Sequence, residues 1–155
     1  MFPFVKKHLY LGQSVDGYPV VNFNSTYTGG IMRTPYINDP LTGYAKDYAG
    51  TVSDLSNFNS GGSVRSYPGG FISSSFTDWR IPSKVEVEGM INISDSAPGI
   101  VTSNRSAWTS TQGEVSGIPT PGTKWVVAWS DPNYFFTAYD ESSTFGVFFI
   151  RNFTL

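Results

Sequence analysis

The sequence of 155 residues contains no cysteine and only one histidine, His8. Without cysteine the chain can form no disulfide, no thiolate metal site and no thiol nucleophile. A single histidine leaves most acid–base and zinc sites without their usual groups. The phosphate-loop, dinucleotide-binding and nucleophile-elbow motifs are missing as well. We therefore expect no catalytic residues and a protein that is not an enzyme.

Charge is also scarce. Charged residues make up 14% of the chain, well below the usual quarter, and the net charge is −2. The basic residues are scattered, so the chain lacks the basic face of a nucleic-acid-binding protein and we expect no nucleic-acid partner. The longest apolar runs, residues 125–129 and 145–150, are too short to span a bilayer, and the first residues lack the charge order of a signal peptide. We expect no membrane insertion.

The chain is instead rich in aromatic residues, at 16%, and in Ser, Thr, Asn and Gly. A high aromatic content with low net charge favours a folded core over disorder. Surfaces made of Tyr, Ser, Gly and Asn are typical of extracellular proteins, virion surfaces and antibody paratopes, where these residues make adaptable contacts. The length suits one domain of ordinary size.

The first half of the chain shows strand signals, then a long polar stretch. In residues 1–35 we expect strands at residues 7–11 and 18–24, with turns at residues 16–17 and 29–30. Residues 36–75 are dense in Gly, Ser, Asn and Asp and are predicted to be mostly irregular. Two short strands are expected within them, at residues 51–52 and 64–65.

One helix is predicted, directly after residue 82. Ser83 can cap it, and Glu86 stands three residues later, which is the spacing of a capping box. Gly89 weakens helical structure, so the helix is expected to be short. The side chains expected to face inward are Val85, Met90 and Ile91.

The last third of the chain predicts an antiparallel meander, because it is rich in Trp, Tyr, Phe and Val. Turn residues separate its segments at residues 119–122, 131–133 and 140–143. The strands are expected at residues 108–111, 124–130, 134–139 and 145–153.

Two tryptophan motifs and the C-terminal segment carry a resemblance. Residues 78–83 read Asp-Trp-Arg-Ile-Pro-Ser, residues 108–111 read Trp-Thr-Ser-Thr, and the aromatic ending runs from residue 125 to residue 153. Together they resemble the C-type-lectin-like domains of bacterial surface proteins and phage receptor-binding proteins, over residues 71–155. That group is related in fold to formylglycine-generating enzymes and to variable phage tropism proteins. The formylglycine-generating relatives rely on cysteines, so this chain lacks the groups for that activity.

The resemblance implies an α+β, C-type-lectin-like fold. Such a fold is loop-rich, with a central antiparallel sheet, one or two short helices and, here, a strand-rich N-terminal extension. The helix that usually precedes the first motif is not evident, because Gly- and Ser-rich sequence occupies its place. We expect residues 1–35 to form a strand-rich attachment segment and residues 36–155 to form the C-type-lectin-like domain.

The residues of the two motifs are expected to be structural. The indole rings fill the core, Arg80 pairs with Asp78 or bonds loop carbonyls, and the hydroxyls of residues 109–111 tie loops to the sheet. The proline precedes the helix cap, where it does no harm. The structural residues are Asp78, Trp79, Arg80, Pro82, Trp108 and Ser110.

The aromatic stretch at residues 134–149 is the candidate binding surface. Because neighbouring residues of a strand face opposite sides, Phe135 and its neighbours cannot all be buried unless both faces are covered. Either one row is exposed for a partner, with tyrosine the better candidate for exposure, or a neighbouring subunit covers it. The ligand-binding residues are expected to be Trp129, Asn133, Tyr134, Tyr139, Asp140 and Glu141.

A calcium site is an alternative use of the same loops. Calcium needs several hard oxygen ligands, which converging loops would supply. The simpler interpretation is that residues 131–133, Asp-Pro-Asn, form an ordinary turn. We therefore expect no cofactor, with calcium as the alternative. Its ligands would be Asp131, Asn133, Asp140 and Glu141.

The resemblance, composition and size predict a non-enzymatic phage virion surface protein, either a head decoration or fibre or a tail receptor-binding component. Its partners would be other virion proteins and a host cell-surface glycan or protein, and we expect a homo-oligomer. The alternative is a carbohydrate-binding lectin, calcium-dependent or not, that is extracellular or on a bacterial cell surface. A third alternative is a glycan hydrolase, although no pair of carboxylates is marked for that role.

Overall fold

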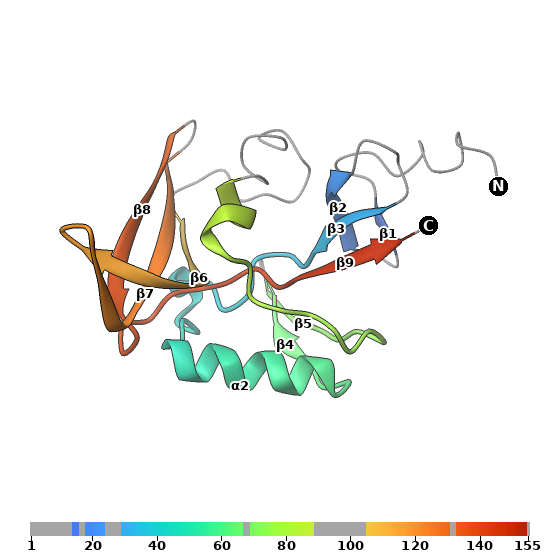
Figure 1. Cartoon of the computed structure of the whole chain (residues 1–155). Coiled ribbons are helices and arrows are strands. Elements are labelled where there is room, and N and C mark those ends of the chain that lie inside the picture. Colours follow the sequence, from blue (N-terminus) through green and yellow to red (C-terminus); the bar gives the residue numbers. More distant parts are fainter. Residues whose placement is uncertain are drawn as a thin grey trace.

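Antiparallel strands with few helices form the structure, which confirms the α+β class (Figure 1). No helix in the described residues is long and apolar enough to cross a membrane. The computed structural model describes residues 14–15, 18–23, 29–66, 69–88, 105–130 and 133–154.

One antiparallel sheet joins early strands to the last strand, in the order β1-β2-β3-β9. β3 pairs with β9 along its whole length, from Gly29 opposite Thr154 to Arg33 opposite Ile150. Strands of the predicted attachment segment therefore share a sheet with the end of the predicted lectin-like domain, and the boundary at residue 35 stays a prediction. The strands are β1 (Ser14–Val15), β2 (Tyr18–Phe23), β3 (Gly29–Arg33) and β9 (Ile150–Thr154).

Predictions for this first segment have mixed outcomes. The strand expected at residues 18–24 is confirmed as β2. The turn expected at residues 29–30 is wrong, because both glycines lie in β3, paired with Thr154 and Phe153. The strand expected at residues 7–11 and the turn expected at residues 16–17 lie outside the described residues.

The first three strands of the predicted meander are confirmed as a second sheet, in the order β6-β7-β8, whereas the fourth belongs to the β1-β2-β3-β9 sheet. The first reversal of the meander is at Ser116 and Gly117, whose φ angles of 54° and 78° suit a tight hairpin turn. The turn expected at residues 119–122 is therefore wrong, and its prolines lie in β7 near a register shift. The strands are β6 (Arg105–Val115), β7 (Ile118–Ser130) and β8 (Asn133–Asp140).

The stretch expected to be irregular contains the long helix α2 (Tyr48–Asn59), so the strand expected at residues 51–52 is wrong. Asp47 caps the helix, since its carboxylate accepts a hydrogen bond from the Gly50 N–H at 2.8 Å. The helix lies below β4 and β5 in Figure 1 and precedes the first tryptophan motif, where the sequence suggested none. The side chains of α2 in the core, spaced three or four apart, are Tyr48, Thr51, Leu55 and Phe58.

Two smaller features flank α2. A short 3-10 helix, η1 (Pro40–Thr42), precedes it. The strand expected at residues 64–65 is confirmed as β4 (Val64–Arg65), which pairs with β5 (Phe71–Ile72).

The predicted capping box is confirmed at the helix over residues 84–88. The Glu86 N–H donates to the Ser83 hydroxyl at 3.2 Å, and the Ser83 N–H donates to the Glu86 carboxylate at 3.0 Å. Val87 is buried and Val85 is 77% exposed, so the inward orientation expected for Val85 is wrong. Met90 and Ile91 lie outside the described residues.

Residues 145–150, here called the central segment, cross the middle of the molecule toward β9 (Figure 1). Val147 and Phe149 join a core cluster with Trp79 and Trp108, whereas Phe148 and Ile150 join a second cluster. Alternate residues of an extended chain face opposite sides, so this segment separates the two clusters. It was predicted as one strand over residues 145–153, but only its end, β9, is continuous, because its earlier bridges have different partners.

Trp79 is buried, as predicted, and fixes the end of α2 to the first motif. Its N–H donates to the Asn59 amide oxygen and its carbonyl accepts from the Asn59 amide nitrogen, both at 2.9 Å. The indole N–H donates to the Ser74 hydroxyl at 2.9 Å, and the ring packs against Phe58. The tryptophan therefore joins α2 to the core with its polar groups satisfied.

The charged residues beside Trp79 pair with other segments, so the pair expected between Asp78 and Arg80 is wrong. Asp78 accepts hydrogen bonds from Arg151 at 2.6 Å and 3.2 Å. The Arg80 guanidinium pairs with Glu86 and donates to Asn152 at 2.9 Å. The motif thereby links the short helix to β9.

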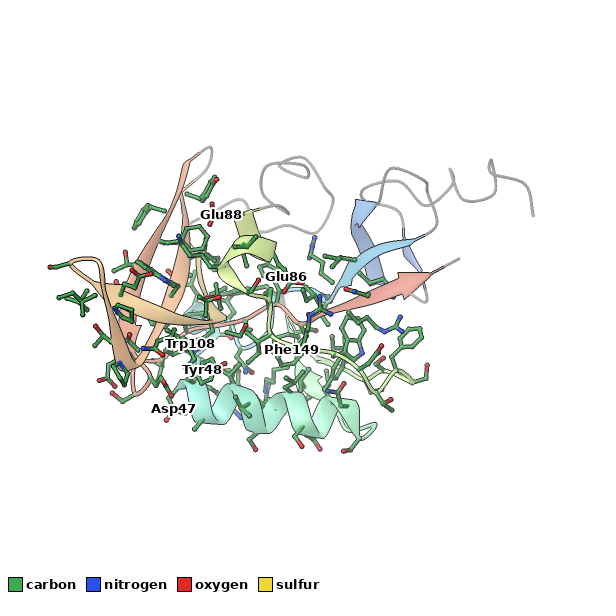
Figure 2. All side chains as sticks on the ribbon, viewed as in Figure 1. Asp47, Tyr48, Glu86, Glu88, Trp108 and Phe149 are labelled. Carbon is green, nitrogen blue, oxygen red and sulfur yellow. The ribbon has the colours of Figure 1, made fainter. Side chains whose placement is uncertain are left out.

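The second motif ties β6 to its surroundings. The Trp108 indole N–H donates to the Lys46 carbonyl at 3.0 Å, and its ring meets Tyr48 edge-on at the start of α2 (Figure 2). The Thr109 hydroxyl donates to the Trp125 carbonyl at 2.8 Å, as predicted for this segment. Ser110 acts through its backbone, whose N–H donates to the Pro82 carbonyl at 2.9 Å.

A buried ion pair joins η1 to β6. The Asp39 carboxylate lies 3.2 Å from the Arg105 Nε, and the two side chains are 3% and 7% exposed. Asp39 also accepts a hydrogen bond from the Leu41 N–H at 3.0 Å. Breaking a pair that is shielded from water in this way is strongly destabilising.

We expect Asp39→Asn to lower the free energy of unfolding by about 3 kcal/mol, because it removes the carboxylate charge that faces the buried Arg105 guanidinium. Asparagine keeps an oxygen for the Leu41 N–H, so the loss reports the charge. The matched control is Asp78→Asn, in an ion pair whose carboxylate side chain is 58% exposed, and it should cost below about 1 kcal/mol. Urea unfolding measures both, and equal losses would contradict the prediction.

Acid should destabilise the fold through Glu86. Burial raises the pKa of this carboxyl, but hydrogen bonds from Arg80 and Ser83 outweigh it, so the pKa is lowered. A lowered folded-state pKa contributes stability above the unfolded value of about 4.3, and this stability is lost as pH falls through the folded pKa. As the pH falls from about 5 to about 3, the Tm of Glu86→Gln should therefore decrease less steeply than that of the unsubstituted chain. Parallel Tm profiles would contradict this.

Candidate ligand-binding surface

β8 exposes one row of side chains and turns the other toward the interior. Phe135 is 57% exposed and Tyr139 is 41% exposed, with Thr137 exposed between them. We call these three residues the β8 strip. The strip follows from the two-residue period of a strand whose sheet is covered on one side. The half-buried row consists of Tyr134, Phe136 and Ala138.

The inner row is covered by the neighbouring strand and the short helix. Phe136 pairs with Val127 of β7, which is fully buried. The Lys84 ammonium lies 5.1 Å from the centre of the Phe136 ring and 5.0 Å from that of Trp125. Tyr134 meets Phe136 edge-on at 6.1 Å. The preference for exposed tyrosine therefore fails at Tyr134, which lies in the inner row, while its neighbour Phe135 is exposed.

Tyr139 is held at one end of the β8 strip. Its ring centre lies 4.8 Å from that of Phe145, and in the sheet it stands opposite Lys124. The Lys124 ammonium pairs with the Glu141 carboxylate at 3.0 Å and lies 4.8 Å from the ring centre of Tyr48. Burial, and then the charge of Glu141, raise the pKa of Tyr48, so its hydroxyl stays protonated at neutral pH.

Two carboxylates follow Tyr139 in the confirmed turn at residues 140–143. The Asp140 carboxylate accepts hydrogen bonds from the Ser142 N–H at 2.9 Å and its hydroxyl at 2.7 Å, and these bonds lower the pKa of Asp140. The Glu141 N–H donates to the Gly122 carbonyl at 2.9 Å, which holds the turn against β7. Acceptor oxygens thus stand beside an aromatic ring, a combination that can hydrogen-bond hydroxyl groups of a stacked ligand.

β8 is also the edge of its sheet. Its inner edge pairs with β7, from Thr123 opposite Asp140 to Ser130 opposite Asn133. Within the described ranges no strand pairs with its outer edge. An exposed edge offers backbone donors and acceptors to another chain, so a polypeptide partner could pair along the outer edge of β8, beside the β8 strip.

The structure brings together half of the predicted ligand-binding residues. Tyr139, Asp140 and Glu141 gather at one end of β8, and Tyr134 lies in the opposite row. Trp129 and Asn133 lie in paired strands, but their side chains are outside the described residues, and those two predictions stay open. The sequence-based list missed Phe135 and Thr137, although the two-residue alternation around Phe135 was the signal for them.

The calcium alternative also stays a prediction. In the part of the chain that the structure describes, no three His, Asp or Glu side chains gather as metal ligands. The Glu141 carboxylate pairs with Lys124, and that of Asp140 accepts from Ser142. Asp131 lies outside the described residues, as does the side chain of Asn133, and the site would need both.

Comparison with known proteins adds no assignment. The sequence matches no protein-family model, and no curated protein matches it. The resemblance of residues 71–155 therefore rests on the motifs themselves. Since one fold can carry many functions, the function has to be argued from the side chains at the site.

Proposed function

We propose that this chain is a non-enzymatic binding protein that displays the β8 strip on a C-type-lectin-like fold. The chain would be a surface component of a phage virion, and its β8 strip would bind a glycan of the host surface. The observation that carries the binding role is the exposure of Phe135 and Tyr139 on one row of an edge strand. The motif resemblance supports the virion setting and the fold type.

The spacing of the two rings favours an extended ligand. They stand four residues apart on one row, so about 13 Å of strand separates their positions. Aromatic rings offer flat apolar faces, and the carboxylates of Asp140 and Glu141 add acceptors at one end. An oligosaccharide, which alternates apolar ring faces with hydroxyl groups, matches this arrangement better than a single sugar does.

The calcium-dependent lectin is the second candidate, favoured by the two carboxylates next to Tyr139. Binding on a bacterial glycan array in calcium, and then in EDTA, separates the two candidates. Binding that survives EDTA supports the metal-free strip. Binding lost in EDTA supports a calcium site in the loops at residues 131–141.

The β8 strip itself is tested by the double substitution Phe135→Ser and Tyr139→Ser. We expect at least a tenfold weaker affinity for the array glycans that bind the unsubstituted chain, because the stacking surface is removed, which corresponds to about 1.4 kcal/mol. The matched control is Val85→Ser, which removes an apolar side chain that is 77% exposed on the short helix.

Two outcomes would contradict the proposal. One is unchanged glycan affinity in the double variant. The other is a fall in oligomeric state, measured by light scattering, when the double variant is compared with the Val85→Ser control. That result would make the strip a contact between subunits and not a ligand-binding surface.

A further inference from the structure

A second hollow lies apart from the β8 strip, between the start of α2 and the β4–β5 hairpin. It is a groove of about 280 Å³. Polar and charged side chains line it beside two aromatic rings, so it offers a small ligand both hydrogen-bonding groups and apolar ring faces. Its polar, charged and aromatic lining includes Asn38, Tyr44, Lys46, Asp54, Arg65 and Phe71.

Arg65 is held flat against aromatic rings in this groove. Its guanidinium carbon lies 3.7 Å from the ring centre of Tyr44 and 4.6 Å from that of Phe71. Phe71 stands directly opposite Arg65 in the hairpin, so the pairing of β4 with β5 fixes one of these contacts. Stacking restrains the planar fork and leaves its in-plane N–H groups pointing past the rings.

Those N–H groups have no acceptor among the residues that the structure describes. Within the described ranges, no oxygen accepts a hydrogen bond from the Arg65 side chain and no carboxylate pairs with it. Every other arginine of the chain pairs with a carboxylate or donates to a carbonyl. These are Arg33, Arg80, Arg105 and Arg151.

Among the described lining residues, the one carboxylate is already satisfied. The oxygens of Asp54 accept from the Lys46 ammonium at 3.1 Å and from the Asn38 amide at 2.9 Å. Lys46 and Asp54 therefore cancel in charge, and Arg65 carries the uncompensated charge of the groove. A bidentate anion fits a guanidinium held in this way.

The geometry points to a binding site for a carboxylate-bearing sugar, of the uronic acid class. The sugar carboxylate would accept two hydrogen bonds from Arg65. Its ring would stack on the rims of the groove, where Tyr44 is 40% exposed and Phe71 is 61% exposed. A free phosphate shares the anion chemistry but makes no use of the rings, so the rings favour the acidic sugar.

NMR titration of the full chain with sodium glucuronate tests this site. We expect saturable shifts of the Gly69 and Gly70 amides, next to the hairpin strands, and at least tenfold weaker binding of methyl glucoside and of inorganic phosphate. Arg65→Lys keeps the charge but loses the planar fork, and it should weaken glucuronate binding at least tenfold. The control Lys84→Gln removes a positive charge elsewhere and should leave the affinity unchanged.

Three results would overturn the inference. They are equal binding of glucuronate and methyl glucoside, phosphate binding as tight as glucuronate binding, and unchanged affinity in an Arg65→Lys variant whose amide spectrum shows an intact fold. The Phe135→Ser and Tyr139→Ser double variant should bind glucuronate like the unsubstituted chain. The experiments can therefore disprove the acidic-sugar site at Arg65 without disproving glycan binding by the β8 strip, and the reverse.

Discussion

The structure depends on satisfying the backbone of the central segment, residues 145–150, away from water. Residues 146–150 are buried, so their N–H and carbonyl groups need partners within the protein. No single strand supplies them. Instead the hydrogen bonds go to five positions in separate parts of the chain, which therefore have to converge on this segment. Those positions are Lys46, Trp108, Ile37, Thr34 and Arg80.

Both candidate binding surfaces are built outward from this arrangement. The turn after β8 leads directly into Phe145, whose ring supports Tyr139 at the end of the β8 strip. Phe145 also exchanges two backbone hydrogen bonds with Lys46, whose ammonium neutralises Asp54 in the groove. One rigid, buried element therefore positions an exposed aromatic row on one side and a polar groove on the other.

Local signals in the sequence predicted the features that depend on neighbouring residues. The meander, the capping box at Ser83 and the buried tryptophans follow from alternation, spacing and residue type. Helix α2 was missed because Ser, Thr, Asn and Gly hide its three-and-four spacing of core side chains, although Asp47 was a cap signal. The ion pairs of Asp78 and Arg80 join residues far apart in the chain, which no local pattern encodes. The contact between Tyr44 and Arg65 also joins residues that are distant in the sequence, so no local pattern predicts it. Which row of β8 is exposed likewise depends on segments far away in the sequence.

The pairing of β3 with β9 has a mechanical consequence. In Figure 1, β9 ends on the side of the molecule away from β8. If the end of β9 is anchored and a ligand is held at β8, tension runs lengthwise through the central segment and along β9. The hydrogen bonds between β3 and β9 lie across that direction, so they are sheared together and do not open one after another. A protein tethered in this way would resist extraction while β8 is under load.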